Sequence, residues 1–379
     1  MSITFRELVS LPQLESIQLL TQTAGLGNPV SGVGILDYEY AENMRDQFHP
    51  GDLVISSFLF AKGREDLLFA SVRELIREGV TALGIKNVYF KSLSPELLAF
   101  ARRHSFPIFL FDHRVMFEDI VTLITDSCRF SAVQQRDAAK LDMLLSPSAS
   151  RGLVQDLTRE LSPLFSEYFF CVYLRCSDDF LFLLRTAERL NSSHLLPSRC
   201  RVFVYRDGLL AVFSSPEPPM GEPADVLADL CRAAGLSPRS AGASRAGVRG
   251  LDQALREALW AFRLGELSQK SVCFFGESGV YRLLLPASES PWARRYCSDL
   301  LAPIEEYDKK YRTDLLITAR RYVENHCSVK RTAEALFQHD NTVRYRLSKI
   351  REVLGMDAEH SRFDLELSLA VLLSELSEL

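Results

Sequence analysis

The chain has 379 residues, of which 47% are hydrophobic and 25% charged, and a formal net charge of -5. This length suggests two or three domains, and the composition is ordinary for a soluble globular protein. The mild acidity excludes a protein that coats nucleic acid with its whole surface. The sequence has no signal-peptide pattern, no apolar run long enough to span a membrane, and no CxxC pair among its eight cysteines. We therefore expect a reduced, cytoplasmic protein without a membrane segment, a metal site or a cofactor.

Residues 1 to about 113 alternate between strand-like and helix-like patterns. Helical spacing covers 64–79 and 94–105, where Ser94 and Pro95 fit the N-cap and first helical positions. Short apolar or β-rich runs flank these helices, at 30–36, 51–58, 80–86 and 106–112. Strands that alternate with helices of about a dozen residues predict an α/β domain with a parallel sheet.

A helical connector is expected over 126–165. The pattern is continuously helical from 113 to 145, without Gly or Pro, and a second helical piece covers 151–165. The long helix is either a core helix of a neighbouring domain or a connector that also pairs with a second subunit. Its apolar positions keep no strict heptad, so both interpretations remain open.

The central section, 166–285, is predicted to be an α+β domain. Its apolar run at 200–215 surrounds Arg206-Asp207-Gly208, and an Asp-Gly pair between such runs predicts a hairpin with a type I′ turn. Asp178 and Asp179 are interpreted as a solvated acidic pair. The other expected elements are strands at 168–176 and 270–278, helices at 224–235 and 251–267, a strand end or loop at 240–247, a loop at 215–223, and a boundary at 286–291.

The usual patterns of catalytic and metal sites are missing. The glycine-rich segment 25–37 fits neither GxGxxG nor GxxxxGK[ST], and 242–247 fails GxSxG because Ala246 replaces the last glycine. The seven histidines show no metal-ligand spacing. We expect no catalytic residues and no enzymatic activity.

Positive charge is concentrated in one part of the C-terminal region, which is expected to be helical from 291 onward. Residues 311–355 contain nine Lys and Arg against five Asp and Glu, a local charge of about +4. Residues 356–379 contain six acids against one Arg. The basic block is therefore local.

Within this block, 328–355 predicts two helices joined by a tight turn. Ser328 fits the N-cap of the first helix, whose apolar stripe is expected to be Ala333, Leu336 and Phe337. The turn is Gln338-His339-Asp340, and either Asp340 or Asn341 is expected to cap the second helix.

On a helical wheel the second helix, about 341–354, separates into two faces. Its apolar stripe spans about 60° and consists of Val343, Leu347, Ile350 and Leu354. Arg344 and Arg346 flank the polar face, with Thr342 near its edge. The polar face consists of Asn341, Tyr345, Ser348, Lys349 and Glu352.

The spacing of these charges alone favours an ordinary amphipathic helix with a solvated basic face in a helical bundle. The preceding short helix and the three-residue turn favour a DNA-binding helix-turn-helix. Asn, Thr and Tyr on the exposed face suit contacts with bases and phosphates, whereas a merely solvated face tends toward Glu and Lys.

Residues 332–357, TAEALFQHDNTVRYRLSKIREVLGMD, together with 364–376, resemble the C-terminal helix-turn-helix of PucR-type (CdaR-like) bacterial transcription regulators. The first 120 or so residues resemble the family's N-terminal sensor domain, and 242–262 resemble its degenerate GGDEF-like domain. The matching motif positions are Thr332, Ala333, Leu336, His339, Asn341, Thr342, Tyr345, Arg346, Leu347, Ile350 and Gly355.

The resemblance implies a multi-domain regulator, with an α/β sensor over 1–125, a degenerate GGDEF-like α+β domain over 166–285 and an all-α helix-turn-helix domain over 300–379. It implies binding to double-stranded promoter DNA, control of a catabolic pathway by a small-molecule effector, and assembly as a homodimer or higher homo-oligomer. His339 would fix the turn, and Asp340 departs from the basic residue that the family often has there. The implied DNA contacts are Asn341, Thr342, Arg344, Tyr345, Arg346 and Lys349.

Two other functions are compatible with parts of the sequence. A nucleotide cyclase-like enzyme could use the fold expected for the central section, although the hairpin YRDGLL lacks the residues that hold metal and nucleotide in an active cyclase. Alternatively, the C-terminal helices could form a scaffold that binds another protein. The effector and its binding residues are not identified by any pattern.

Overall fold

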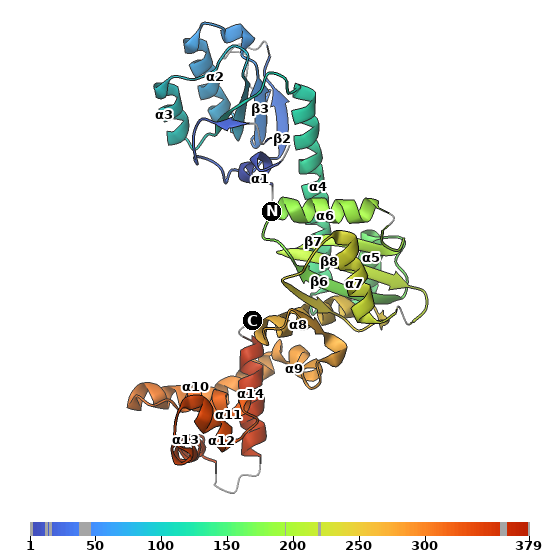
Figure 1. The fold of residues 1–379 in the computed structure, drawn as a ribbon, viewed down its shortest axis with the longest axis vertical. Coiled ribbons are helices and arrows are strands. Elements are labelled where there is room, and N and C mark those ends of the chain that lie inside the picture. The colour runs from blue at the N-terminus through green and yellow to red at the C-terminus, as the bar shows by residue number, and fades with distance from the viewer. Residues whose placement is uncertain are drawn as a thin grey trace. The chain divides into compact units, whose positions relative to one another are not determined.

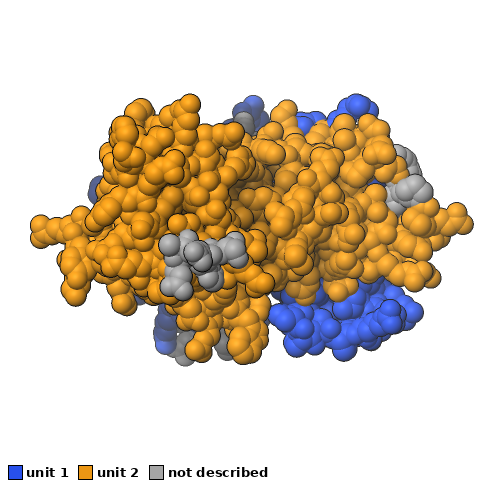
Figure 2. Space-filling model, turned by 90° about the horizontal axis from the view of Figure 1, so that it is seen from below, with its two compact units in different colours: residues 1–165, 175–213, 232–236 blue, residues 166–174, 214–231, 237–379 orange. Residues whose placement is uncertain are grey.

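A computed structural model describes residues 3–11, 14, 17–37, 47–193, 195–218, 221–356 and 362–377. The chain forms two compact units, whose residues are coloured separately in Figure 2. Unit 1 comprises residues 1–165, 175–213 and 232–236, and unit 2 comprises 166–174, 214–231 and 237–379.

Unit 1 contains the predicted parallel sheet (Figure 1). The strands β2 (Gly32–Ile35), β3 (Asp52–Ser56), β4 (Ala82–Lys86) and β5 (Ile108–Phe111) are parallel neighbours in sequence order. A short strand that was not predicted, β1 (Gln18–Leu19), pairs antiparallel with β5. The α/β prediction for the N-terminal region is therefore confirmed.

Helices α2 (Glu65–Arg77) and α3 (Pro95–Arg103) pack on this sheet. The predicted start of α3 is confirmed, because the Ser94 side chain accepts a hydrogen bond from Leu97 N–H and Pro95 is the first helical residue. Two short helices, α1 (Phe5–Val9) and a 3-10 turn (Leu59–Ala61), were not predicted.

The expected long helix is α4 (Phe117–Leu144), and it is followed by α5 (Arg151–Leu161). The first part of α4 packs on β2 and its later part on β7 (Cys200–Tyr205), which also belongs to unit 1. Between the buried apolar ends of α4 lies a buried polar stretch that contains Ser131, Gln134 and Asp137. A single helix thus contributes to the core around β2 and to the packing around β7.

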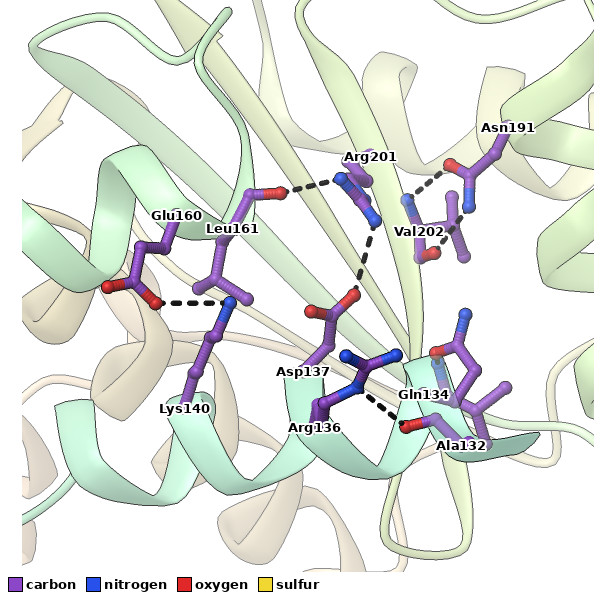
Figure 3. A network of polar contacts seen from close by, with 11 residues as sticks. Ala132, Gln134, Arg136, Asp137, Lys140, Glu160, Leu161, Asn191, Arg201 and Val202 are labelled. Carbon is purple, nitrogen blue, oxygen red and sulfur yellow. Dashed lines mark hydrogen bonds and ion pairs between the residues drawn. The ribbon is translucent and has the colours of Figure 1, made fainter. Parts of the chain in front are cut away.

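Gln134 and Asp137 of this polar stretch contact β7 (Figure 3). The Gln134 carbonyl oxygen accepts the Val204 N–H at 3.1 Å, and the Asp137 carboxylate pairs with Arg201 at 3.2 Å. The Asn191 amide bonds both backbone groups of Val202, accepting the N–H at 2.8 Å and donating to the carbonyl at 2.7 Å. Burial raises the pKa of Asp137, and the Arg201 guanidinium opposes that shift.

The predicted hairpin joins β7 to β8 (Gly208–Ser215), but its turn differs from the expected one. Gly208 pairs with Tyr205, so the two-residue loop is Arg206-Asp207, and Arg206 has a φ of 52°. The Asp-Gly type I′ assignment was therefore wrong. Gly208 continues the β8 pairing and does not occupy a central turn position.

Helix α6 (Phe180–Ser192) was missed, since its first residues read as a continuous apolar run. Asp179 caps this helix, and its carboxylate accepts hydrogen bonds from Leu181 and Phe182 N–H. Asp178 and Asp179 are both exposed, as predicted, and Asp179 in addition stabilises the N-terminus of this helix.

Unit 2 contains strands β6 (Tyr168–Arg175), β9 (Ser240–Ala243), β10 (Val248–Arg249) and β11 (Val272–Phe274). The pairs are β9 with β11, parallel, and β10 with β6, antiparallel. The predicted helix over 251–267 is α8 (Leu251–Leu267), which packs against β9. A further predicted helix is α7 (Pro223–Ala234).

The C-terminal part of unit 2 is helical, as expected. Its helices are α9 (Tyr281–Ser288), α10 (Pro291–Tyr311), α11 (Leu315–Glu324), α12 (Val329–Leu336), α13 (Asp340–Val353) and α14 (Phe363–Ser377). The predicted boundary at 286–291 is largely helical, because Pro286 lies inside α9 and Pro291 starts α10. These helices share an apolar core that includes Ile304, Leu315 and Phe363.

No helix within the described residues is both long and apolar enough to cross a membrane. Across the same described ranges, His, Cys, Asp and Glu side chains form no cluster that could hold a metal ion.

Gly242 in β9 offers a test of the α8–β9 packing. A Cβ atom on Gly242 would lie 2.1 Å from the Phe262 nitrogen and 2.4 Å from the Ala258 oxygen, both in the backbone of α8. Gly242→Ala should therefore lower the free energy of unfolding by about 3 kcal/mol, measured by urea denaturation. Gly152→Ala in α5 is the matched control, since its Cβ would meet no atom within 4 Å, and it should be neutral or stabilise by up to about 1 kcal/mol. Equal urea midpoints for the two variants would contradict this packing.

Candidate nucleic-acid interface

Helices α12 and α13 form the predicted helix-turn-helix, and they lie side by side against α11 (Figure 1). The Ser328 hydroxyl accepts the Arg331 N–H at 3.5 Å, so the expected cap of α12 is present at long hydrogen-bond distance. Helix α12 ends at Phe337, whose φ of 53° is left-handed and whose N–H bonds the carbonyls of Ala333 and Glu334. The turn is thus closed by backbone groups.

The cap of α13 is His339, not Asp340 or Asn341 as predicted. His339 Nδ1 accepts the Asn341 N–H at 3.2 Å, while Asp340 is the first residue inside the helix. An extended backbone at His339 brings its ring over the free N–H groups, which explains why the imidazole takes this role. Asp340 keeps a favourable charge–dipole position in the first turn.

The apolar face of α13 is buried as the wheel predicted. Val343 and Ile350 are fully buried, Leu347 is nearly so, and Leu354 is half-buried at the end of the helix. The expected stripe on α12 is only partly correct: Ala333 is buried, but Phe337 is 94% exposed. The left-handed backbone at the end of α12 takes Phe337 off the helical wheel.

Several predicted contact residues lie on the outer surface of α13. Asn341 and Arg344 are exposed, Tyr345 is 69% exposed, and Thr342 is half-buried. Ser348 is exposed on the same helix. These side chains offer an amide, hydroxyl groups and a guanidinium to a ligand outside the domain, a mixture that suits contacts with bases and phosphates.

Arg346 has internal partners. Its guanidinium lies 3.2 Å from the Asp314 carboxylate and 3.1 Å from the Thr318 hydroxyl, and its side chain is only 21% exposed. Both partners belong to the start of α11, Asp314 as its N-cap residue. Arg346 therefore ties α13 to α11.

Lys349 is also engaged inside the domain. Its ammonium donates to Glu352 at 2.8 Å and lies 5.4 Å from the centre of the Tyr307 ring in α10. The hydrogen bond to Glu352 is the main cause of its raised pKa. The positive charge of Lys349 is thereby partly neutralised by Glu352.

Two cations that the sequence interpretation did not select are exposed on α12, Lys330 and Arg331. They belong to the basic block, but only residues of the second helix were predicted to contact DNA. The first helix of a helix-turn-helix crosses the DNA backbone, which could have pointed to them.

The internal role of Arg346 can be separated from an external one. Arg346→Ala should lower the free energy of unfolding of the C-terminal helices by about 1 kcal/mol, because it removes a partly buried ion pair and a hydrogen bond. Arg344→Ala, two residues away and exposed, should change it by less than about 0.5 kcal/mol. Urea denaturation followed by circular dichroism measures both, and equal stabilities for the two variants would refute the internal role.

Comparison with known proteins gives matches at both ends of the chain. Residues 7–127 match the purine catabolism regulatory protein-like family, and residues 315–373 match the PucR C-terminal helix-turn-helix domain. The second match runs from α11 into α14 and so contains all of α12 and α13.

Among curated proteins, the proline-responsive transcriptional activator PutR of Bacillus subtilis is 30% identical over 126 residues, covering 32% of this chain and 31% of the relative. The purine catabolism regulatory protein of the same organism is 31% identical over 127 residues, covering 32% and 23%. The matches thus span less than a third of either relative. A solved structure, a regulator of polyketide synthase expression from Bifidobacterium adolescentis, aligns with 64% of this chain and 93% of its own at 20% identity, with a TM-score of 0.28. The chain thus carries, over residues 7–127 and 315–373, two segments that match domains of PucR-type regulators.

Proposed function

We propose that this chain is a DNA-binding transcriptional regulator that responds to a small-molecule effector and controls a catabolic pathway. The observation that carries the proposal is the helix-turn-helix of α12 and α13, whose apolar side is buried while Asn341, Arg344 and Tyr345 face outward. The relatives' names, a proline-responsive activator and a purine catabolism regulator, support the metabolic part.

The proposed DNA-contact residues differ in the contacts that they make within the domain, and we assign them different roles accordingly. Asn341, Thr342 and Tyr345 are the candidates for base and phosphate contacts at the start of the recognition helix. Arg344 is the candidate for an ion pair with a phosphate, together with exposed Lys330 and Arg331 on α12. Arg346 and Lys349, which the resemblance also implied, act mainly by positioning α13, because each already has partners in the domain.

Asp340 is expected to limit the affinity of each subunit for DNA. It is half-buried in the first turn of α13, so its carboxylate lies at the end of the helix that enters the major groove. A carboxylate there stabilises the helix but repels phosphate. We expect modest affinity per subunit, compensated by a homodimer or higher homo-oligomer that occupies two half-sites.

The effector is proposed to bind in unit 1, where a cavity of about 1060 Å³ lies beside α4 and α6. Its lining combines cations, carboxylates and apolar side chains, which suits a small metabolite that carries both charged and apolar groups. The residues that define this character are Arg114, Asp119, Arg129, Phe130, Leu181 and Glu188. A metabolite that binds there should raise Tm in a thermal-shift screen, and Arg129→Ala should reduce the shift.

The central section, 166–285, is proposed to be a degenerate GGDEF-like α+β domain without catalytic activity. The order of its helices and strands supports this assignment. Its hairpin loop, Arg206-Asp207, contains a single carboxylate, and that carboxylate already forms an ion pair with Arg175. The enzyme alternative is tested by incubation with GTP or ATP and magnesium, followed by chromatography. Formation of any cyclised or hydrolysed product would contradict the assignment of a domain without catalytic activity.

DNA binding is measured by fluorescence anisotropy on duplexes from upstream of the protein's own and neighbouring genes. Arg344→Ala should weaken binding severalfold and reduce the slope of log K against log salt by about one, since one phosphate contact is lost.

Asp340→Asn should tighten binding severalfold while lowering the free energy of unfolding by roughly 0.5 kcal/mol, because the favourable interaction between the carboxylate and the helix dipole is lost.

Absence of binding by the wild-type chain at low salt, with and without metabolites, would refute the regulator proposal. Retained DNA binding by residues 300–379 alone would count against the scaffold alternative.

A further inference from the structure

Phe337 occupies an unfavourable conformation without any packing that offsets it. Its φ of 53° lies in the left-handed region, which costs an L-residue other than Gly or Asn free energy. Its side chain is 94% exposed, so burial of the ring does not compensate. Glycine is the residue that best fits this position at the end of α12.

Phe58 shows how the same backbone is stabilised elsewhere. Its φ is 51°, almost the value at Phe337, but its ring is fully buried and packs against Phe60 and Phe90 at centroid distances of 5.5 Å and 6.5 Å. Burial of an aromatic ring contributes far more than the left-handed backbone costs. At Phe337 the large apolar ring is instead almost fully exposed at this backbone position, and it is therefore available to a partner outside the folded domain.

The position of Phe337 identifies the partner. It lies two residues before His339, the cap of the recognition helix, and therefore in the turn that leads into the part of α13 expected to enter the groove. The nearest exposed cations in the sequence are Arg331 and Arg344, on the two helices that the turn connects. A partner attracted by this charge is a polyanion, and the apolar group that duplex DNA presents in its major groove is the thymine methyl.

We infer that Phe337 is a specificity residue whose ring contacts a thymine C5-methyl group at the edge of the recognition site. The inference rests on the proposed DNA binding and adds a direct base preference to it. It accounts for the three observations together: the left-handed backbone, the exposed ring and the place in the turn.

The test compares two duplexes. The first is selected by the wild-type chain from a random-sequence pool, and the second replaces its thymines with uracil, which lacks the C5-methyl group. Phe337→Gly should weaken binding to the thymine duplex about tenfold. It should leave binding to the uracil duplex unchanged and raise Tm by roughly 2 to 4 °C, because glycine relieves the left-handed strain.

Phe337→Asn provides a second variant that tolerates the same backbone, and it should behave like the glycine variant. Trp292→Ala is the matched control: Trp292 is also an exposed aromatic residue, at 81%, but it belongs to α10. It should leave affinity for both duplexes unchanged.

Unchanged affinity of both Phe337 variants for the thymine duplex would overturn the inference, as would an equal loss on both duplexes. Unchanged affinity with loss of transcription in a purified system would assign the ring to a protein partner and overturn it as well. If the wild-type chain enriches no duplex from the pool, the DNA-binding proposal itself fails, which is a separate result.

Discussion

The burial of one face of α13 is the constraint on which the candidate interface depends. Val343, Leu347 and Ile350 join the apolar core of the C-terminal helices, and this fixes the rotation of α13 about its own axis. The outward orientation of Asn341, Arg344 and Tyr345 follows from that rotation. Arg346 adds a polar anchor to α11, so the helix is held both by apolar burial and by a specific ion pair. A rigid recognition helix loses less conformational entropy on binding DNA.

Fewer basic side chains of the C-terminal helices are free of internal partners than the count of Lys and Arg in the sequence suggests. The local excess of basic residues is the feature that suggests nucleic acid, but two of the cations on α13 are bound to partners in the same domain. The exposed positive charge of these helices therefore comes more from Arg344 and from Lys330 and Arg331 on α12 than from the whole basic block. Surface pairs of this kind are weak individually. Here the ion pairs of Arg346 and Lys349 matter mainly because they leave fewer cations on α13 available to an outside partner.

Most elements could be predicted where local signals agree. The bounds of α8 match the expected 251–267, and the Ser94-Pro95 start of α3 is correct, because periodicity and capping are encoded by neighbouring residues. Helix α6 was missed because its apolar start hides the helical period, and only Asp179 marked its beginning. The partners of Arg346 and Lys349 could not be predicted, since Asp314 and Tyr307 come from other helices. The exposure of Phe337 depends on a backbone angle that a helical wheel does not represent.

The side-chain contacts along β7 have a consequence for how copies of this chain meet. A strand at the end of a sheet presents unpaired N–H and carbonyl groups on which another chain can add a strand. In the described sheet β7 lies at such an end, and the Asn191 amide bonds the N–H and carbonyl of Val202 as a neighbouring strand would. Gln134 occupies the N–H of Val204, two residues further along the same edge. The edge is thus already paired by side chains, and an incoming strand would have to displace both amides before it could bind there.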